Sequence, residues 1–124
     1  MYKRQVYEQA LSGGFPANGM MADVCAALPE AEIRVMGLPA MARVTRISEE
    51  RLTQLSKTSP VFAPGAKNYL KMGGLDTLWE GDLSACLTDA LEHVDATDHR
   101  RVRGLERGGR LLADTVVKRV LASV

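Results

Sequence analysis

The groups best suited to proton chemistry stand together in one short segment, "HVDATDH", residues 93–99. This segment contains both histidines of the chain, His93 and His99, and two aspartates, Asp95 and Asp98. Imidazoles and carboxylates are the groups from which general acid–base sites are most often built. The segment therefore holds the first candidates for a catalytic site.

Other motifs that carry chemistry are weaker. The serines lack the GxSxG setting of a nucleophile elbow. The glycine pairs Gly13-Gly14 and Gly73-Gly74 match neither a P-loop nor a GxGxxG pattern, so they predict turns. Five arginines within residues 100–110 form the one local charge run. In a chain of nearly neutral charge, this run favours a solvated loop over an anion-binding site.

The two cysteines, Cys25 and Cys86, lie far apart in apolar stretches. Such residues are most often small buried side chains, which is what we expect of both. The sequence contains no CxxC or HxxxH spacing, so we expect no structural zinc site. No motif indicates another metal or a cofactor, and none assigns a cellular compartment.

Composition describes one ordinary globular domain. The chain has 124 residues, of which 46% are hydrophobic, enough for a single core. Its 16 basic and 15 acidic residues leave a formal net charge of +1, so nothing attracts the whole chain to nucleic acid. No apolar run approaches the length of a membrane span. We therefore expect neither nucleic acid nor a membrane span among its partners.

The first half of the chain alternates helix and strand. Apolar residues at helical spacing predict a helix over residues 18–28. Residues 32–38 predict a buried strand, and their near-continuous apolar character places it at the centre of a sheet. Residues 37–47 are expected to be an irregular connection, since Gly and Pro interrupt them. Ser48 then caps a helix over residues 49–57.

The second half begins with an irregular stretch, residues 59–74, that is rich in proline and glycine. It predicts a short strand at Val61-Phe62 or at Tyr69-Leu70, confined to a sheet edge by the neighbouring prolines. A stripe of leucines predicts a helix over residues 83–94. Residues 95–109 are polar and predict a loop.

The clearest periodicity is in the last segment. Leu112, Val116, Val120 and Val124 recur every four residues, which predicts an amphipathic C-terminal helix that packs on the rest of the fold. Helices and strands thus alternate along the chain, and two amphipathic helices follow. This order is typical of an α/β fold with a mainly parallel sheet.

Two stretches resemble the C-terminal half of an SGNH (GDSL-type) hydrolase, a family of serine esterases. They are "ALPEAEIRVMGLPAM", residues 27–41, and "GLERGGRLLADTVVKRVL", residues 104–121. The first is similar to the family's strand with its GLPPM-like turn, and the second to its closing helix. The resemblance implies a flavodoxin-like three-layer sandwich with a mainly parallel sheet, truncated at its N-terminus.

The resemblance also implies a chemistry. In that family an early nucleophilic serine works with a late Asp-x-x-His pair. His99 would be the general base, and Asp95 or Asp98 would orient it, although neither aspartate stands three residues before it. The serine would lie upstream, so the chain alone is expected to be inactive toward a small-molecule ester. We expect no cofactor, and self-association through an exposed sheet edge.

The first five residues, "MYKRQ", have no cap and no apolar pattern. They resemble the translated transposon end that is left by construction of sequencing libraries. We therefore predict that residues 1–5 are a non-native tail that packs on nothing. Residues 6–124 would then be a single α/β domain, the C-terminal part of a longer protein.

Two other functions stay open at this point. "EIRVMGLPA" and "MGGLDTLWEGDLSACL" also resemble the C-terminal α/β domain of a transketolase-like, thiamine-diphosphate-dependent enzyme. That domain supports dimerisation and carries out no chemistry itself. The third possibility is a non-enzymatic α/β interaction module that binds an anionic partner through its arginine-rich loop.

Overall fold

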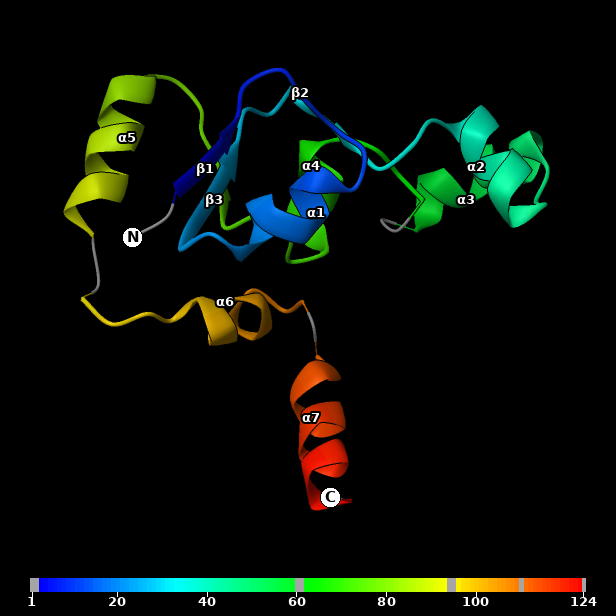
Figure 1. Ribbon diagram of the computed structural model, residues 1–124. Coiled ribbons are helices and arrows are strands. Elements are labelled where there is room, and N and C mark those ends of the chain that lie inside the picture. Colours follow the sequence, from blue (N-terminus) through cyan, green and yellow to red (C-terminus); the bar gives the residue numbers. More distant parts are fainter. Residues whose placement is uncertain (1–2, 60–61, 94–95, 110, 124) are drawn as a thin grey trace.

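The computed structural model describes residues 3–59, 62–93, 96–109 and 111–123. Its elements follow one another in the order seen in Figure 1. Their bounds are β1 (Lys3–Val6), β2 (Gln9–Leu11), α1 (Gly14–Asn18), the 3-10 turn η1 (Gly19–Met21), β3 (Val24–Ala27), β4 (Glu32–Arg34), α2 (Leu38–Thr45), α3 (Glu49–Thr58), α4 (Ala66–Lys71), β5 (Thr77–Leu78), α5 (Leu83–Glu92), α6 (Arg100–Glu106) and α7 (Ala113–Ala122).

Every strand pairing in the described part of the chain is parallel. One sheet has the order β1-β3-β5, and the other pairs β2 with β4. Parallel neighbours need a crossover, and the helices that follow the strands provide it. The result is an α/β architecture with parallel sheets and helices on both sides, which confirms the predicted fold class.

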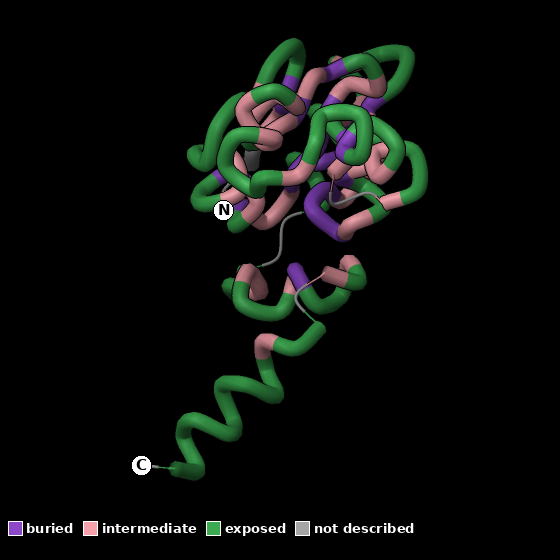
Figure 2. Tube along the Cα trace, turned by 90° about the vertical axis from the view of Figure 1, so that its right-hand side faces the viewer, coloured by how far each residue is buried: buried purple, intermediate pink, exposed green. Residues whose placement is uncertain are grey.

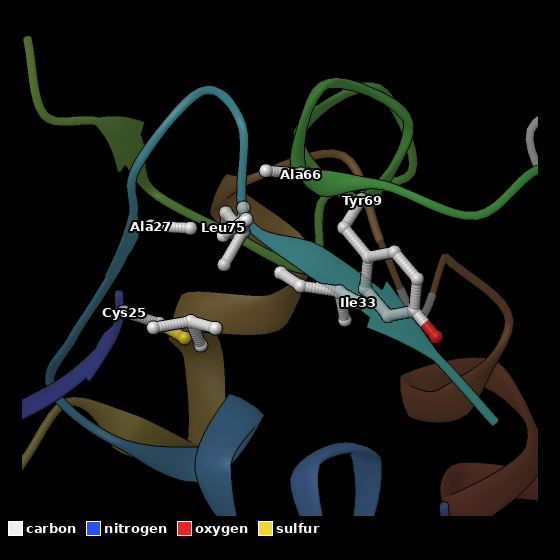
Figure 3. Close-up of a cluster of buried hydrophobic side chains, with 8 residues drawn as sticks. Cys25, Ala27, Ile33, Ala66, Tyr69 and Leu75 are labelled. Carbon is white, nitrogen blue, oxygen red and sulfur yellow. The ribbon is translucent and has the colours of Figure 1, made fainter. Parts of the chain in front are cut away.

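The main core lies between the two sheets and α4. Ile33 from β4 and Cys25 from β3 are fully buried, and Leu75 and Tyr69 close over them (Figure 3). Phe15 of α1 covers this cluster, with its ring centroid 6.0 Å from that of Tyr69. A smaller cluster joins β3 to α5 through apolar contacts of Ala26, Trp79 and Ala90.

The strand β3 corrects the prediction of a helix over residues 18–28. Only Gly19–Met21 form a helical turn there, whereas Val24–Ala27 form the middle strand of the larger sheet. Residues 25–27 are buried. A short apolar run that is buried on both faces has no diagnostic period, so its spacing could not separate helix from strand.

The predicted strand at residues 32–38 exists, but it is shorter and is not central. It covers Glu32–Arg34 and, within the described residues, pairs with β2 alone. Ile33 is fully buried, whereas Val35 is 45% exposed. The chain turns away after Arg34 toward α2, so the apolar residues beyond it face a crevice and solvent instead of a sheet neighbour.

Three helices occupy segments for which other structures were predicted. Residues 37–47 contain α2, because Pro39 stands in the first turn of the helix, where its missing N–H costs nothing. Residues 59–74 contain α4 in place of the strand at Tyr69-Leu70, and Val61 lies outside the described residues. Residues 95–109 contain α6, which is held by a contact from far away in the sequence.

Two helix predictions are confirmed, and the prediction for the N-terminus is wrong in part. The Ser48 hydroxyl accepts the Arg51 N–H at 3.3 Å at the start of α3, and α5 occupies the predicted segment. Residues 3–5 belong to β1 and pair with Val24, Cys25 and Ala26 of β3. The prediction that residues 1–5 pack on nothing is therefore wrong for residues 3–5. That residues 1–5 are a non-native tail stays a prediction, and so does a domain that begins at residue 6 and ends at residue 124.

The last two helices form a separate feature that we call the arm, residues 100–122. The described residues 3–59 and 62–93 are called the body, and residues 96–99 lead from it to the arm. Helix α7 points away from the body (Figures 1 and 2), and its residues 114–122 are exposed. The predicted C-terminal helix is therefore present, but its apolar face does not pack on the body.

Candidate functional site

The carboxyl ends of β2 and β4 lie side by side. The two strands are parallel and in register from Gln9 opposite Glu32 to Leu11 opposite Arg34. One residue further on, the Ser12 N–H donates to the Arg34 carbonyl oxygen at 3.0 Å. In α/β proteins, ligands bind preferentially at this edge of a parallel sheet, where strands give way to helices. We therefore take this edge as the candidate site.

The first wall of the site is the turn Ser12-Gly13-Gly14, which leads from β2 into α1. Ser12 adopts a left-handed conformation with φ of 68°. Nothing lies within 4 Å of the position that a Cβ would take at Gly13 or Gly14, so a ligand can approach the backbone there. The first N–H groups of a helix have no partner within that helix. The turn is thus a suitable donor of hydrogen bonds to a carbonyl oxygen.

The second wall is the segment from Arg34 to the start of α2. It borders a cavity of about 340 Å³ that is lined mainly by apolar side chains. Arg34 supplies a cation, and its Nε is 3.0 Å from Glu32 Oε1 with both side chains more than a third exposed. Glu49, in the first turn of α3, brings one carboxylate to the same cavity.

A second, larger cavity lies between the β1–β2 segment and α1. It holds about 600 Å³ and is lined by ten residues, among them Glu8, Tyr7, Asn18 and, from the glycine turn, Gly14. No Lys or Arg is among these lining residues, and Glu8 is an anion. A carboxylate ligand is therefore disfavoured here relative to the cavity beside Arg34.

The predicted proton-transfer residues lie elsewhere. Asp98 and His99 precede α6, and neither lines the two cavities described above. Asp95 lies outside the described residues. The Asp98 carboxylate is engaged by Arg100, whose Nε donates to Oδ1 at 2.8 Å and whose backbone N–H donates at 3.1 Å.

Arg100 therefore stabilises the ionised form of Asp98. Hydrogen bonds from its side chain and backbone hold the pKa of Asp98 well below the ordinary value. The Asp98 carboxylate thus forms an ion pair with Arg100. His93, on the other side of the segment, contacts Asp89 one helical turn earlier. The assignment of His99 with Asp95 or Asp98 stays a prediction.

A partly buried ion pair connects distant parts of the chain. Arg107 Nη1 is 3.0 Å from Asp76 Oδ2, and the same oxygen accepts the Cys25 N–H at 2.7 Å. Arg107 Nη2 donates to the Met20 carbonyl at 3.0 Å. The side chains of Arg107 and Asp76 are only 9% and 19% exposed. The pair fixes the base of the arm against β3 and η1, which is a structural role.

The residues of the crevice escaped the sequence reasoning for a specific reason. The pair Gly13-Gly14 predicts a turn, and Arg34 lies within the otherwise apolar segment that predicts a strand, so neither indicates a ligand. The available signal was a glycine pair directly after a short strand, but that strand, β2, was not predicted. Within the described residues no group of three or more metal-ligating side chains comes together, and no helix has the length and apolarity to cross a membrane.

The fold and site define an α/β chain with an apolar cavity beside Arg34 at the carboxyl edge of a parallel sheet. Comparison with known families then identifies the chain. Residues 4–124 match the family model described as malonate decarboxylase gamma subunit, MdcE. Because this match covers nearly the whole chain, the chain belongs to the malonate decarboxylase gamma subunit family.

Individual relatives agree with this family. The chain is 31% identical over 129 residues to the malonyl-S-ACP:biotin-protein carboxyltransferase MADD of Malonomonas rubra. The aligned region covers 90% of this chain and 44% of that protein. It is similar to a Pseudomonas malonate decarboxylase hetero-tetramer in complex with coenzyme A, with a TM-score of 0.67, 26% identity, and coverage of 96% of this chain and 50% of that one.

A Pseudomonas MdcD-MdcE hetero-dimer matches with a TM-score of 0.63 and 26% identity, over 96% of this chain and 49% of that one. The chain thus spans about half the length of the relatives it matches. The names of all three relatives refer to malonyl or malonate chemistry, and the two solved structures are hetero-oligomers.

These matches overturn the functional predictions from sequence. The chain is not an SGNH hydrolase, and the serine esterase activity, the ester substrate and the hydrolase class are wrong. The transketolase-like alternative is wrong as well, and the interaction module is not better supported. Short leucine–proline and strand–turn segments recur in many α/β proteins, so 15 to 18 residues could not separate one family from another. The expectation of self-association gives way to the hetero-oligomers of the relatives.

Proposed function

We propose that this chain is part of a malonate decarboxylase gamma-type subunit and binds a malonyl thioester at the carboxyl edge of β2 and β4, with the carboxylate in the cavity beside Arg34 and the thioester oxygen toward the turn Ser12-Gly13-Gly14. The family supports a malonyl substrate, and one related structure was determined with coenzyme A, a thiol that forms such thioesters. In this proposal a second subunit completes the enzyme, as the hetero-oligomeric relatives suggest.

The chemistry needs two kinds of contact. Decarboxylation breaks the bond between the malonyl Cα and its carboxylate carbon, and the electron pair moves onto the thioester oxygen as an enolate. Carbon dioxide leaves or passes to a carrier, and a proton then returns to Cα. The enolate oxygen requires hydrogen-bond donors, which provide the largest stabilisation of such intermediates. The carboxylate requires a cation while the substrate binds.

The observation that carries the proposal is the hydrogen bond from the Ser12 N–H to the Arg34 carbonyl, at 3.0 Å. It places the backbone of the glycine turn, whose Gly14 lines the larger cavity, next to the backbone of Arg34, the one cation that lines the smaller cavity. The turn would donate N–H groups to the thioester oxygen, and Arg34 would hold the carboxylate. The apolar lining from Val35, Met36 and Leu38 would exclude water from the bond that breaks.

Calorimetric titration with malonyl-CoA and acetyl-CoA tests this proposal. The two ligands differ by the carboxylate, so the chain should bind malonyl-CoA at least about tenfold more tightly, the effect of one charged contact of about 1.4 kcal/mol. Arg34→Gln should remove this preference. Arg43→Gln, an exposed arginine on α2, is the matched control and should retain it. Equal affinity for both ligands, or a preference that survives Arg34→Gln, would contradict the proposal.

A further inference from the structure

Among the described residues that line the cavity beside Arg34, Tyr69 is the only one with a hydroxyl group. The residue belongs to the main core and is only 7% exposed. Figure 3 shows its ring beside Ile33, with the hydroxyl pointing away from Ala66 and Leu75 and toward the carboxyl end of β4. The side chain therefore has an apolar end in the core and a polar end at the candidate site.

Backbone and ring contacts fix the position of this side chain. Helix α4 begins directly beside β4, where the Gly65 N–H donates to the Ile33 carbonyl at 2.9 Å, and Tyr69 follows one turn later. At the other end of α4, the Gly74 N–H donates to the Tyr69 carbonyl at 2.8 Å. The ring of Phe15 packs against the Tyr69 ring at a tilt of 58°. The hydroxyl is thus held in place before a ligand arrives, which lowers the entropy cost of binding.

The Tyr69 hydroxyl has no hydrogen-bond partner within the described residues. Arg107 Nε is the one fully buried polar side-chain atom without a partner in that part of the chain, so the Tyr69 oxygen is accessible from the cavity. The Tyr7 hydroxyl, in contrast, donates to Gln5 Oε1 at 2.8 Å. Tyrosines with buried rings usually have a partner for the hydroxyl. A ligand in the cavity would supply the partner that the chain does not.

The chemistry of the cavity favours a carboxylate as that partner. Burial raises the pKa of Tyr69, so the hydroxyl keeps its proton at neutral pH and can donate it in a hydrogen bond. Arg34 is the only cation in the lining, and most other lining side chains are apolar. A carboxylate has two oxygens that accept hydrogen bonds, and it can use a guanidinium and a hydroxyl together. Hydrogen bonds in such an apolar setting are stronger than in water.

We infer that the Tyr69 hydroxyl donates a hydrogen bond to the carboxylate of the malonyl group and so helps the chain to distinguish malonyl from acetyl thioesters. The identity of the ligand rests on the proposed function. One carboxylate oxygen is bound by Arg34 and the other by Tyr69. The carboxylate loses its charge as carbon dioxide forms, so this hydrogen bond is strongest before the reaction. Tyr69 is therefore a specificity residue for substrate binding.

The test is a calorimetric titration of the full chain and two variants with malonyl-CoA and with acetyl-CoA. Tyr69→Phe keeps the ring and its packing and removes only the hydroxyl. It should reduce the preference for malonyl-CoA at least about threefold, as the loss of one hydrogen bond does, and leave the affinity for acetyl-CoA unchanged. Tyr7→Phe removes a hydroxyl at the other cavity and is the matched control. It should retain the preference, because contacts with parts that both ligands share cancel in the ratio.

The other outcomes overturn the inference. A wild-type preference that disappears in Arg34→Gln but persists in Tyr69→Phe would exclude Tyr69 and leave the proposed function intact. Equal affinity of the wild type for both ligands would overturn the proposed function, and the inference with it. Equal weakening of both ligands by Tyr69→Phe would assign the hydroxyl to the fold or to the shared part of the ligand. The same loss of preference in Tyr7→Phe would show that the effect is not specific to the cavity beside Arg34.

Discussion

The body and the arm are built from similar numbers of apolar residues per helix but are stabilised in different ways. In the body, Leu75, Ile33 and Leu52 are buried almost completely, and two parallel sheets share one core. In the arm, the leucines and valines of α7 are exposed, and its base is held by one ion pair. An apolar stripe on a helix therefore does not indicate whether the surface that covers it belongs to the same chain or to another molecule.

The largest difference in the free energy of unfolding should come from truncating one leucine to alanine in each region. Leu75→Ala deletes a residue that is 1% exposed in the main core and should lower the free energy of unfolding by between about 2 and 5 kcal/mol. Leu112→Ala, at 76% exposure, should lower it by less than about 0.5 kcal/mol. Urea denaturation measures both. Similar losses would mean that α7 packs on the body in solution.

The second prediction concerns the attachment of the arm. Arg107→Met keeps the aliphatic packing but leaves Asp76 without its cation, which should cost about 2 kcal/mol. This is below the ~3–5 kcal/mol of a fully buried pair because Asp76 is 19% exposed. Hydrogen exchange of the α6 amides should accelerate, while that of β3 changes little. Arg103→Met, whose partner Glu106 is on the exposed surface at 3.6 Å, is the control. Unchanged protection of α6 would show that other contacts hold the arm.

The smallest effect should appear at the junction of the two regions. Asp98 has a lowered pKa in the folded chain, because Arg100 donates to its carboxylate. A lowered pKa stabilises the fold above the ordinary aspartate pKa of about 3.9, and this contribution declines as the pH falls below that value. Asp98→Asn removes it at all pH values. The difference in melting temperature between the two chains should therefore shrink from pH 7 toward pH 2. A constant difference would show that the Asp98 charge is irrelevant.

Several features could be predicted from local residues alone. The Ser48 cap of α3 and the leucine stripe of α5 depend on neighbours within one or two turns, and both elements occur where they were expected. The α/β class also followed, because the alternation of helix and strand limits how layers can pack. The family did not follow, and the esterase assignment was wrong because its supporting motifs were too short and too common.

Other features depended on contacts between distant segments. Val24–Ala27 is a strand because β1 and β5 flank it, and a buried four-residue run has no period of its own. The crevice exists because β2 and β4 pair in parallel and bring Ser12 beside Arg34, 22 positions apart in the chain. The sequence by itself determined the local helices, the caps and the layer type, which short-range interactions set. Only the tertiary structure decided which strand is central, where the crevice lies and that the last helix remains uncovered, because burial and pairing are properties of the assembled chain.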